Sequence, residues 1–110
     1  MKPARRTDWY VVSAHGSILF YIAMHPGCTA EEIAETMHLT RRTVWGLVGD
    51  LRRAGMLSVR RSGRYHFYRV NEEAEFPHPA IKGVTIGTVV NALLRDSEKD
   101  FRTPAASRFA

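Results

Sequence analysis

The stretch TAEEIAETMHLTRRTVWGLVGDLRRAG, residues 29–55, predicts two short helices separated by a tight turn. Thr29 and Glu32 have the spacing of a capping box, in which each side chain accepts a hydrogen bond from the other residue's backbone amide. The first helix should end at His38, and Thr40 should cap the second. Two short helices joined this closely must cross steeply, which predicts a helix-turn-helix.

The second helix has an apolar side and an unusual opposite side. Its apolar residues recur with the period of a helix, at Val44, Leu47, Val48 and Leu51. The opposite side, with Trp45 at its flank, consists of Arg42, Gly46, Gly49 and Arg53. Each central glycine costs about 1 kcal/mol of helix propensity relative to Ala. Gly55 can adopt the left-handed conformation that ends a helix.

A basic hairpin follows the two helices. Residues 56–61 and 64–70 are rich in strand-forming residues, and Ser62 and Gly63 are expected to form the turn between them. Alternation in the second strand places Tyr65, Phe67 and Arg69 on one face and His66, Tyr68 and Val70 on the other. Both faces carry aromatic residues, so the pattern does not decide which one faces the core. The fold class predicted from these segments is mostly α with a small β-hairpin wing, a winged helix-turn-helix.

Apolar helices flank this central block. A helix from near Ser13 to His25 is apolar on all sides at residues 18–24, so it must be covered on more than one side. Residues 85–94 read as a second short apolar helix that packs on the first, within one chain or across a dimer. The expected organisation is an N-terminal arm (1–12), a winged helix-turn-helix domain (13–72), a connector and C-terminal dimerisation or capping helix (73–94), and a disordered tail (95–110).

Positive charge is concentrated in the central block. Between residues 36 and 70 there are eight arginines and a single acid, Asp50, a local net charge of +7 against +5 for the whole chain. Charge placed in this way is typical of a surface that contacts phosphates and releases counterions. Arginine in particular favours bidentate contacts to phosphate or guanine.

The segments HLTRRTVWGLVGDLRRAGML and SVRRSGRYHFYRVN, together residues 38–71, resemble winged-helix transcriptional regulators of the MarR/ArsR type. The resemblance extends over roughly residues 9–94. His38 stands where these proteins usually have Gly, and His is among the residues that tolerate a positive φ. The resemblance implies a sequence-specific regulator that binds double-stranded DNA, with the second helix in the major groove and the wing on the backbone or minor groove. We also expect a homodimer.

The expected DNA-binding residues lie at the start of the second helix and on the wing. They are Thr40, Arg41, Arg42, Thr43, Trp45, Arg60, Arg61 and Arg64. The two glycines leave an alternative open, because a reading helix usually presents polar side chains to the bases. In that alternative, the surface binds a protein and the domain is an interaction module with only nonspecific DNA binding. Trp45 could also fold back onto the first helix or the wing.

Other functional classes find little support in the sequence. No phosphate-binding loop, nucleophile with a matching base, or paired catalytic carboxylates is present, so we expect neither an enzyme nor a cofactor. His15, His25 and Cys28 are the group to suspect for a metal- or thiol-responsive switch, but we expect no metal site. No apolar run reaches the roughly 20 residues of a membrane span, no signal peptide is evident, and a lone cysteine fits a reducing compartment. We therefore expect a cytoplasmic protein that does not associate with membranes.

Overall fold

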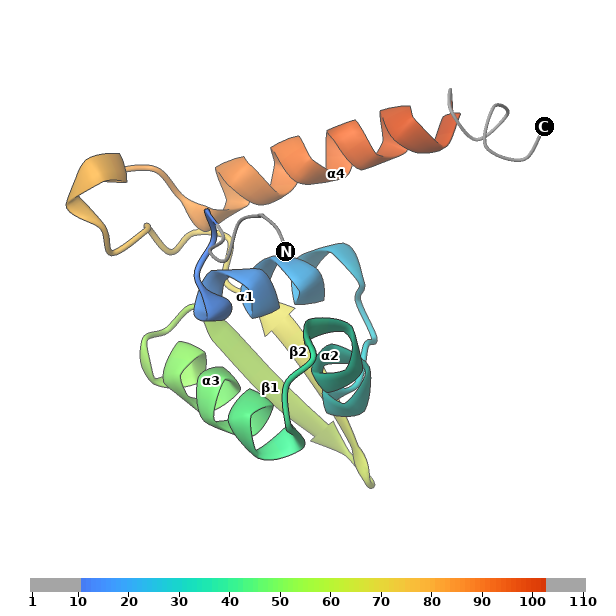
Figure 1. The fold of residues 1–110 in the computed structure, drawn as a ribbon. Helices are drawn as coiled ribbons and strands as arrows, with labels where there is room; N and C mark the ends of the chain where they lie inside the picture. The colour runs from blue at the N-terminus through green and yellow to red at the C-terminus, as the bar shows by residue number, and fades with distance from the viewer. Residues whose placement is uncertain (1–10, 103–110) are drawn as a thin grey trace, which may run out of the picture.

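The structure is a computed structural model that describes residues 11–102, and within this range it has the predicted winged-helix fold (Figure 1). In chain order the elements are α1 (Ala14–Met24), α2 (Ala30–Met37), α3 (Arg41–Arg53), β1 (Leu57–Ser62), β2 (Tyr65–Val70), a short 3-10 turn η1 (Pro79–Ile81) and α4 (Ile86–Arg102). Helix α1 is central, since it contacts α3 and β2 on one side and α4 on the other. Of the expected N-terminal arm, only Val11 and Val12 are described.

The helix-turn-helix forms as its capping residues predict. The amide of Glu32 donates to Thr29 Oγ1 at 3.1 Å, and the amide of Thr29 donates to Glu32 Oε1 at 2.8 Å, which completes the capping box. His38 has φ = 57° and ends α2 in the left-handed conformation. Thr40 then caps α3 by accepting a hydrogen bond from the amide of Thr43 at 3.1 Å. The crossing angle of the two helices is therefore set by local hydrogen bonds at a turn of three residues.

The core lies where α1, α3 and α4 meet the inner face of the hairpin. Its fully buried side chains come from all of these helices and from α2: Ile18, Ile33, Val44, Val48, Ile86 and Val90. Each such side chain contributes on the order of 1.5–3 kcal/mol relative to its exposed state. Leu51 is also buried, whereas Leu47 is half-buried at the edge of the apolar stripe of α3. The stripe predicted from the sequence therefore faces the core.

The wing is a two-stranded antiparallel ribbon in which Ser62 pairs with Tyr65. The turn residues are consequently Gly63 and Arg64, and the predicted turn at Ser62 and Gly63 is wrong by one residue. Gly63 has φ = 64°. A positive φ at the first of two turn residues is the pattern of a type II′ turn, which matches the twist of the strands.

Burial decides the two faces of the wing. Tyr68 and Val70 pack against the core, and His66 lies on the same face. Phe67, on the other face, is 44% exposed. The phenol oxygen of Tyr68 is buried and has no hydrogen-bond partner among residues 11–102. Burial raises the pKa of this group, with a smaller contribution from Cys28.

Helix α4 is joined to the end of the wing. The amide of Ile86 donates to the Ala74 carbonyl at 2.8 Å, and the amide of Gly87 donates to the Glu72 carbonyl at 2.9 Å. Residues 75 and 85 also form an isolated antiparallel bridge. A Cβ at position 87 would lie 2.8 Å from the Glu72 carbonyl oxygen, so the close contact requires glycine.

The expected end of this helix at Leu94 is wrong, because α4 continues to Arg102. The charged stretch after Leu94 has no apolar period, a pattern that favours disorder. It contains neither Gly nor Pro before residue 104, however, and Glu, Lys and Arg are good helix formers. The rest of the expected tail, residues 103–110, lies outside the described range. The far part of α4 extends past α1 in Figure 1.

Candidate nucleic-acid interface

The exposed side of α3 is made by its first turn and its glycines. Arg42 and Gly46 are exposed, as the helical period predicts. A Cβ at Gly46 would have no neighbour within 4 Å, whereas one at Gly49 would lie 3.2 Å from Nη1 of Arg53. Packing within the described residues therefore does not require glycine at position 46.

The first turn of α3 combines capping with charge. The hydroxyl of Thr40 donates to Oγ1 of Thr43 at 2.9 Å, so both threonine side chains are held at the helix start. Arg41 Nη1 lies 3.4 Å from Oε2 of Glu31 on α2, and both side chains are largely exposed. A surface ion pair of this kind contributes only about 0–1 kcal/mol, so a phosphate can replace the carboxylate.

Trp45 lies at the border between α3 and the wing. Its ring is 5.1 Å from the ring of His66, edge to face, and the residue is 39% exposed. The side chain therefore leans on the wing, one of the positions that the sequence left open, while more than a third of its surface stays accessible. An edge-to-face pair of this kind fixes the orientation of both rings.

The three wing arginines proposed from the sequence point in different directions. Arg61 pairs with His66 across the ribbon and shares its face, which is the face toward α3. Arg60 pairs with Phe67 and belongs to the outer face. Arg64 is in the turn and is exposed. The wing consequently carries a cation on each face and one at its tip.

A pocket of about 310 Å³ separates α3 from the wing. It is lined by Trp45, Val48, Gly49, Arg52, Val59, Arg61 and His66. Arg52 and His66 are not among the binding residues proposed from the sequence, whereas Gly49 belongs to the side of α3 proposed there as a binding surface. The helical period indicates that residues 45, 49 and 52 share one side of α3. The pairing of Arg61 with His66 depends on the turn at Gly63 and Arg64, which the sequence pattern does not predict.

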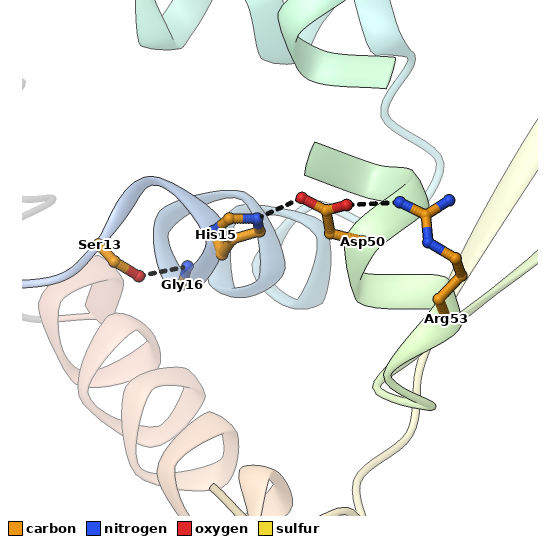
Figure 2. Close-up of polar contacts among 5 residues, drawn as sticks. All are labelled: Ser13, His15, Gly16, Asp50 and Arg53. Atoms are coloured by element: carbon orange, nitrogen blue, oxygen red, sulfur yellow. Dashed lines mark hydrogen bonds and ion pairs between the residues drawn. The ribbon is translucent and has the colours of Figure 1, made fainter. Parts of the chain in front are cut away.

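A polar contact links the start of α1 to the end of α3 (Figure 2). His15 Nε2 lies 2.9 Å from Oδ2 of Asp50, and Arg53 donates to the other oxygen of the same carboxylate. The hydrogen bonds from His15 and then Arg53 hold the pKa of Asp50 below its ordinary value. Ser13, the cap of α1, accepts a hydrogen bond from the amide of Gly16 beside this contact. The single acid of the basic segment thus positions α3 against α1.

The residues considered for a metal- or thiol-responsive switch do not form a site. In the part of the chain that the structure describes, no three His, Cys, Asp or Glu side chains are close enough to hold a metal ion. Cys28 is buried, and burial, followed by the charge of Glu32, raises the pKa of its thiol. A raised pKa disfavours the reactive thiolate. Within residues 11–102, no helix is long and apolar enough to span a bilayer.

A second and more apolar pocket, of about 520 Å³, lies between α1, the connector and α4. Val12, Phe20, Phe76, Ile81 and Val89 are among its lining side chains, and His15 also lines it. Val11, another lining residue, is 90% exposed. The pocket lies on the side of the molecule where α4 crosses α1.

Comparison with known proteins identifies the fold. A sequence model of the MarR family matches residues 13–64, which include α1, the helix-turn-helix and the first strand of the wing. No curated protein matches the chain in sequence. A single-residue mutant of ZitR from Lactococcus lactis superimposes with a TM-score of 0.55 at 17% identity, over 96% of this chain and 65% of that one. A crystal structure of a MarR family transcription regulator gives 0.52 at 19% identity, over 91% and 60%.

The chain spans less than two thirds of the length of these two structures. Their low sequence identity means that they establish the fold alone. The match to the family model covers the helices and the strand that carry the basic surface. The chain therefore has the winged-helix fold of MarR-family transcription regulators, and the resemblance found in its sequence is confirmed.

Proposed function

We propose that the protein is a transcriptional regulator that binds double-stranded DNA in a sequence-specific way. Helix α3 would lie in the major groove, and the wing would contact the backbone or the neighbouring minor groove. The observation that carries this proposal is that the exposed side of α3 and the wing together form one basic surface on a MarR-type winged helix. A basic surface of this kind attracts the duplex and neutralises its phosphates.

The first turn of α3 would enter the groove. Thr40 and Thr43 are held by the helix cap, and Arg41 and Arg42 extend from the same turn. Arginine at the start of a reading helix can form bidentate contacts with guanine. Trp45 would contact a thymine methyl group or a sugar through the part of its ring that His66 does not cover.

The wing would straddle the backbone. Because Arg60 and Arg61 belong to opposite faces of the ribbon, both can contact phosphates only if the ribbon tip enters the groove with a strand of DNA on each side. Arg64 at the turn would then reach deepest. Changing Arg61 or Arg64 to Ala should weaken binding to all duplexes alike and lower the log–log salt slope by about 0.9 each.

We further propose that the protein acts as a homodimer joined through α4. Apolar side chains are exposed along this side of the molecule, at Val11, Val12, Ile81 and Leu94. Deleting all residues after Lys82 should produce monomers or aggregates in sedimentation experiments at micromolar concentration. A stable monomer both with and without this segment would contradict the dimer, and with it the expectation of paired half-sites about one helical turn apart.

The decisive experiment is a gel shift with a library of duplexes at two salt concentrations. A regulator selects a sequence and shows a steep salt slope. A slope without selection would indicate a nonspecific binder, which is what the alternative function, a protein-interaction module, predicts. Absence of binding at low salt would overturn the proposal altogether.

A further inference from the structure

The pocket between α3 and the wing contains an arginine from each element. We propose that this pocket binds one phosphate of the DNA backbone, with Arg52 of α3 and Arg61 of β1 as its ligands. The inference rests on the proposed DNA binding and adds a contact position to it. Arg52 lies eleven residues after Arg41, about three turns from the start of the reading helix. It assigns a role to the end of α3 that the helix-turn-helix pattern alone does not.

The two arginines of the pocket are available for a ligand. Arg41 is paired with Glu31, and Arg53 is paired with Asp50. Neither Arg52 nor Arg61 forms an ion pair with any acidic side chain that the structure describes. The protein thus neutralises two arginines of α3 internally and leaves the pocket arginines uncompensated, so the pocket keeps its positive potential in the free protein.

The size of the pocket and the residues that line it suit one phosphate group of a nucleic-acid backbone. Gly49 lines it without a side chain of its own, and the guanidinium of Arg53 lies nearby, 3.2 Å from where a Cβ of residue 49 would be. Its wall is the edge-to-face pair of Trp45 and His66, which holds the pocket open between the two elements. A volume of about 310 Å³ is at the lower end of ligand pockets, which run from roughly 300 to 1,000 Å³. A phosphodiester with its sugar fits this size better than a larger organic ligand.

Guanidinium groups from two different elements also fit phosphate chemistry. Each guanidinium can donate two parallel hydrogen bonds to phosphate oxygens. A phosphate held between Arg52 and Arg61 would fix the angle between α3 and the wing when DNA is bound. The same chemistry could accept a free phosphate ion, so the experiment has to separate the backbone from the free anion.

The test combines variants with a backbone scan. Arg52→Ala and Arg61→Ala should each lower the log–log salt slope by about 0.9, and the double variant should lower it by the same amount, because one phosphate is lost in all three. In a duplex series with one neutral methylphosphonate at successive positions, one position should weaken wild-type binding and leave the double variant unaffected. The matched control is Arg69→Ala, which removes the same charge from the base of the wing on its outer face.

The outcomes separate this inference from the proposed function. If wild type binds duplexes but Arg52→Ala has the same salt slope as wild type, the pocket assignment is wrong while DNA binding stands. If wild type does not bind duplexes, the proposed function fails first. Arg52→Lys supplies a second variant, expected to keep the slope and lose affinity, since lysine cannot donate in bidentate fashion.

Titration with inorganic phosphate tests whether the pocket binds a free anion instead of the DNA backbone. Amide shifts at Gly49 on adding millimolar phosphate, together with a scan in which no position distinguishes wild type from the double variant, would assign the pocket to a free anion and overturn the proposal. Melting temperatures of all variants are measured alongside. Arg52 and Arg61 are exposed, so these temperatures should stay close to that of wild type.

Discussion

Changing Gly46 to Ala should make the protein more stable and its DNA complex weaker. The residue is exposed in the middle of α3, and a Cβ there would have no neighbour within 4 Å. The substitution therefore adds no clash and removes the propensity cost of a glycine, about 1 kcal/mol. For a domain of this size, that gain raises the melting temperature by on the order of 4 °C.

The opposite effect is expected on binding, because the added methyl group would occupy the space where α3 approaches the DNA. Inserting a methyl group into a close-packed contact costs on the order of 1–3 kcal/mol. Affinity for the preferred duplex should therefore fall roughly 5- to 150-fold. Urea denaturation measures the first quantity, and fluorescence anisotropy with a labelled duplex measures the second.

The control is Asn91→Ala, at an exposed position of α4. It should also stabilise its helix, by up to about 0.7 kcal/mol, and leave affinity unchanged. If Gly46→Ala stabilises the protein and binds DNA as well as wild type does, the central face of α3 is not in contact with the duplex. The glycine would then have no explanation in DNA binding.

Three further changes test other parts of the structure. Trp45→Ala should weaken binding to the preferred duplex by on the order of 1–3 kcal/mol and binding to random duplex by much less. If a stable variant discriminates between duplexes as well as wild type does, Trp45 is not in the DNA interface. If the variant instead loses a captured protein partner, the interaction module is favoured. Gly87→Ala should destabilise the protein by on the order of 1–3 kcal/mol in urea denaturation, because its Cβ would meet the Glu72 carbonyl. Asp50→Asn should lower stability at neutral pH. The pKa of Asp50 is lowered in the folded state, so its contribution is present above the ordinary carboxyl pKa and disappears as the pH falls through the folded-state value. Stability curves of Asp50→Asn and wild type should thus converge in acid, and parallel curves would contradict a role for the His15 contact.

The helices of the central block could be predicted because their signals are local. The capping box at Thr29, the left-handed His38 and the cap at Thr40 each depend on residues within four positions of one another. The helical period of α3 likewise identified its buried side. Residues 95–102 of α4 have neither a cap nor an apolar period, so the sequence pattern places the end of this helix too early.

Contacts between distant segments could not be predicted from the sequence. His15 and Asp50 are 35 residues apart, and nothing near either residue indicates the other. The position of Arg52 in a pocket depends on the wing folding back along α3. Which face of the ribbon Arg60 and Arg61 belong to depends on the position of the turn, and the sequence pattern places that turn one residue too early. The DNA-binding residues named from the sequence thus stay a proposal, although the structure brings α3 and the wing to a common surface.

The joint between the wing and α4 has a mechanical consequence. The hydrogen bonds from Ile86 and Gly87 to the residues just after β2 connect the ribbon rigidly to α4, so the two should move together. The bridge between residues 75 and 85 closes the connector between them into a loop at the side. Lengthening or shortening that loop should leave the orientation of the wing relative to α4 unchanged. If two chains meet through α4, the distance between their two wings then depends on the angle between α4 and the wing at Gly87. Tilting α4 by even a few degrees would move each wing tip along the duplex.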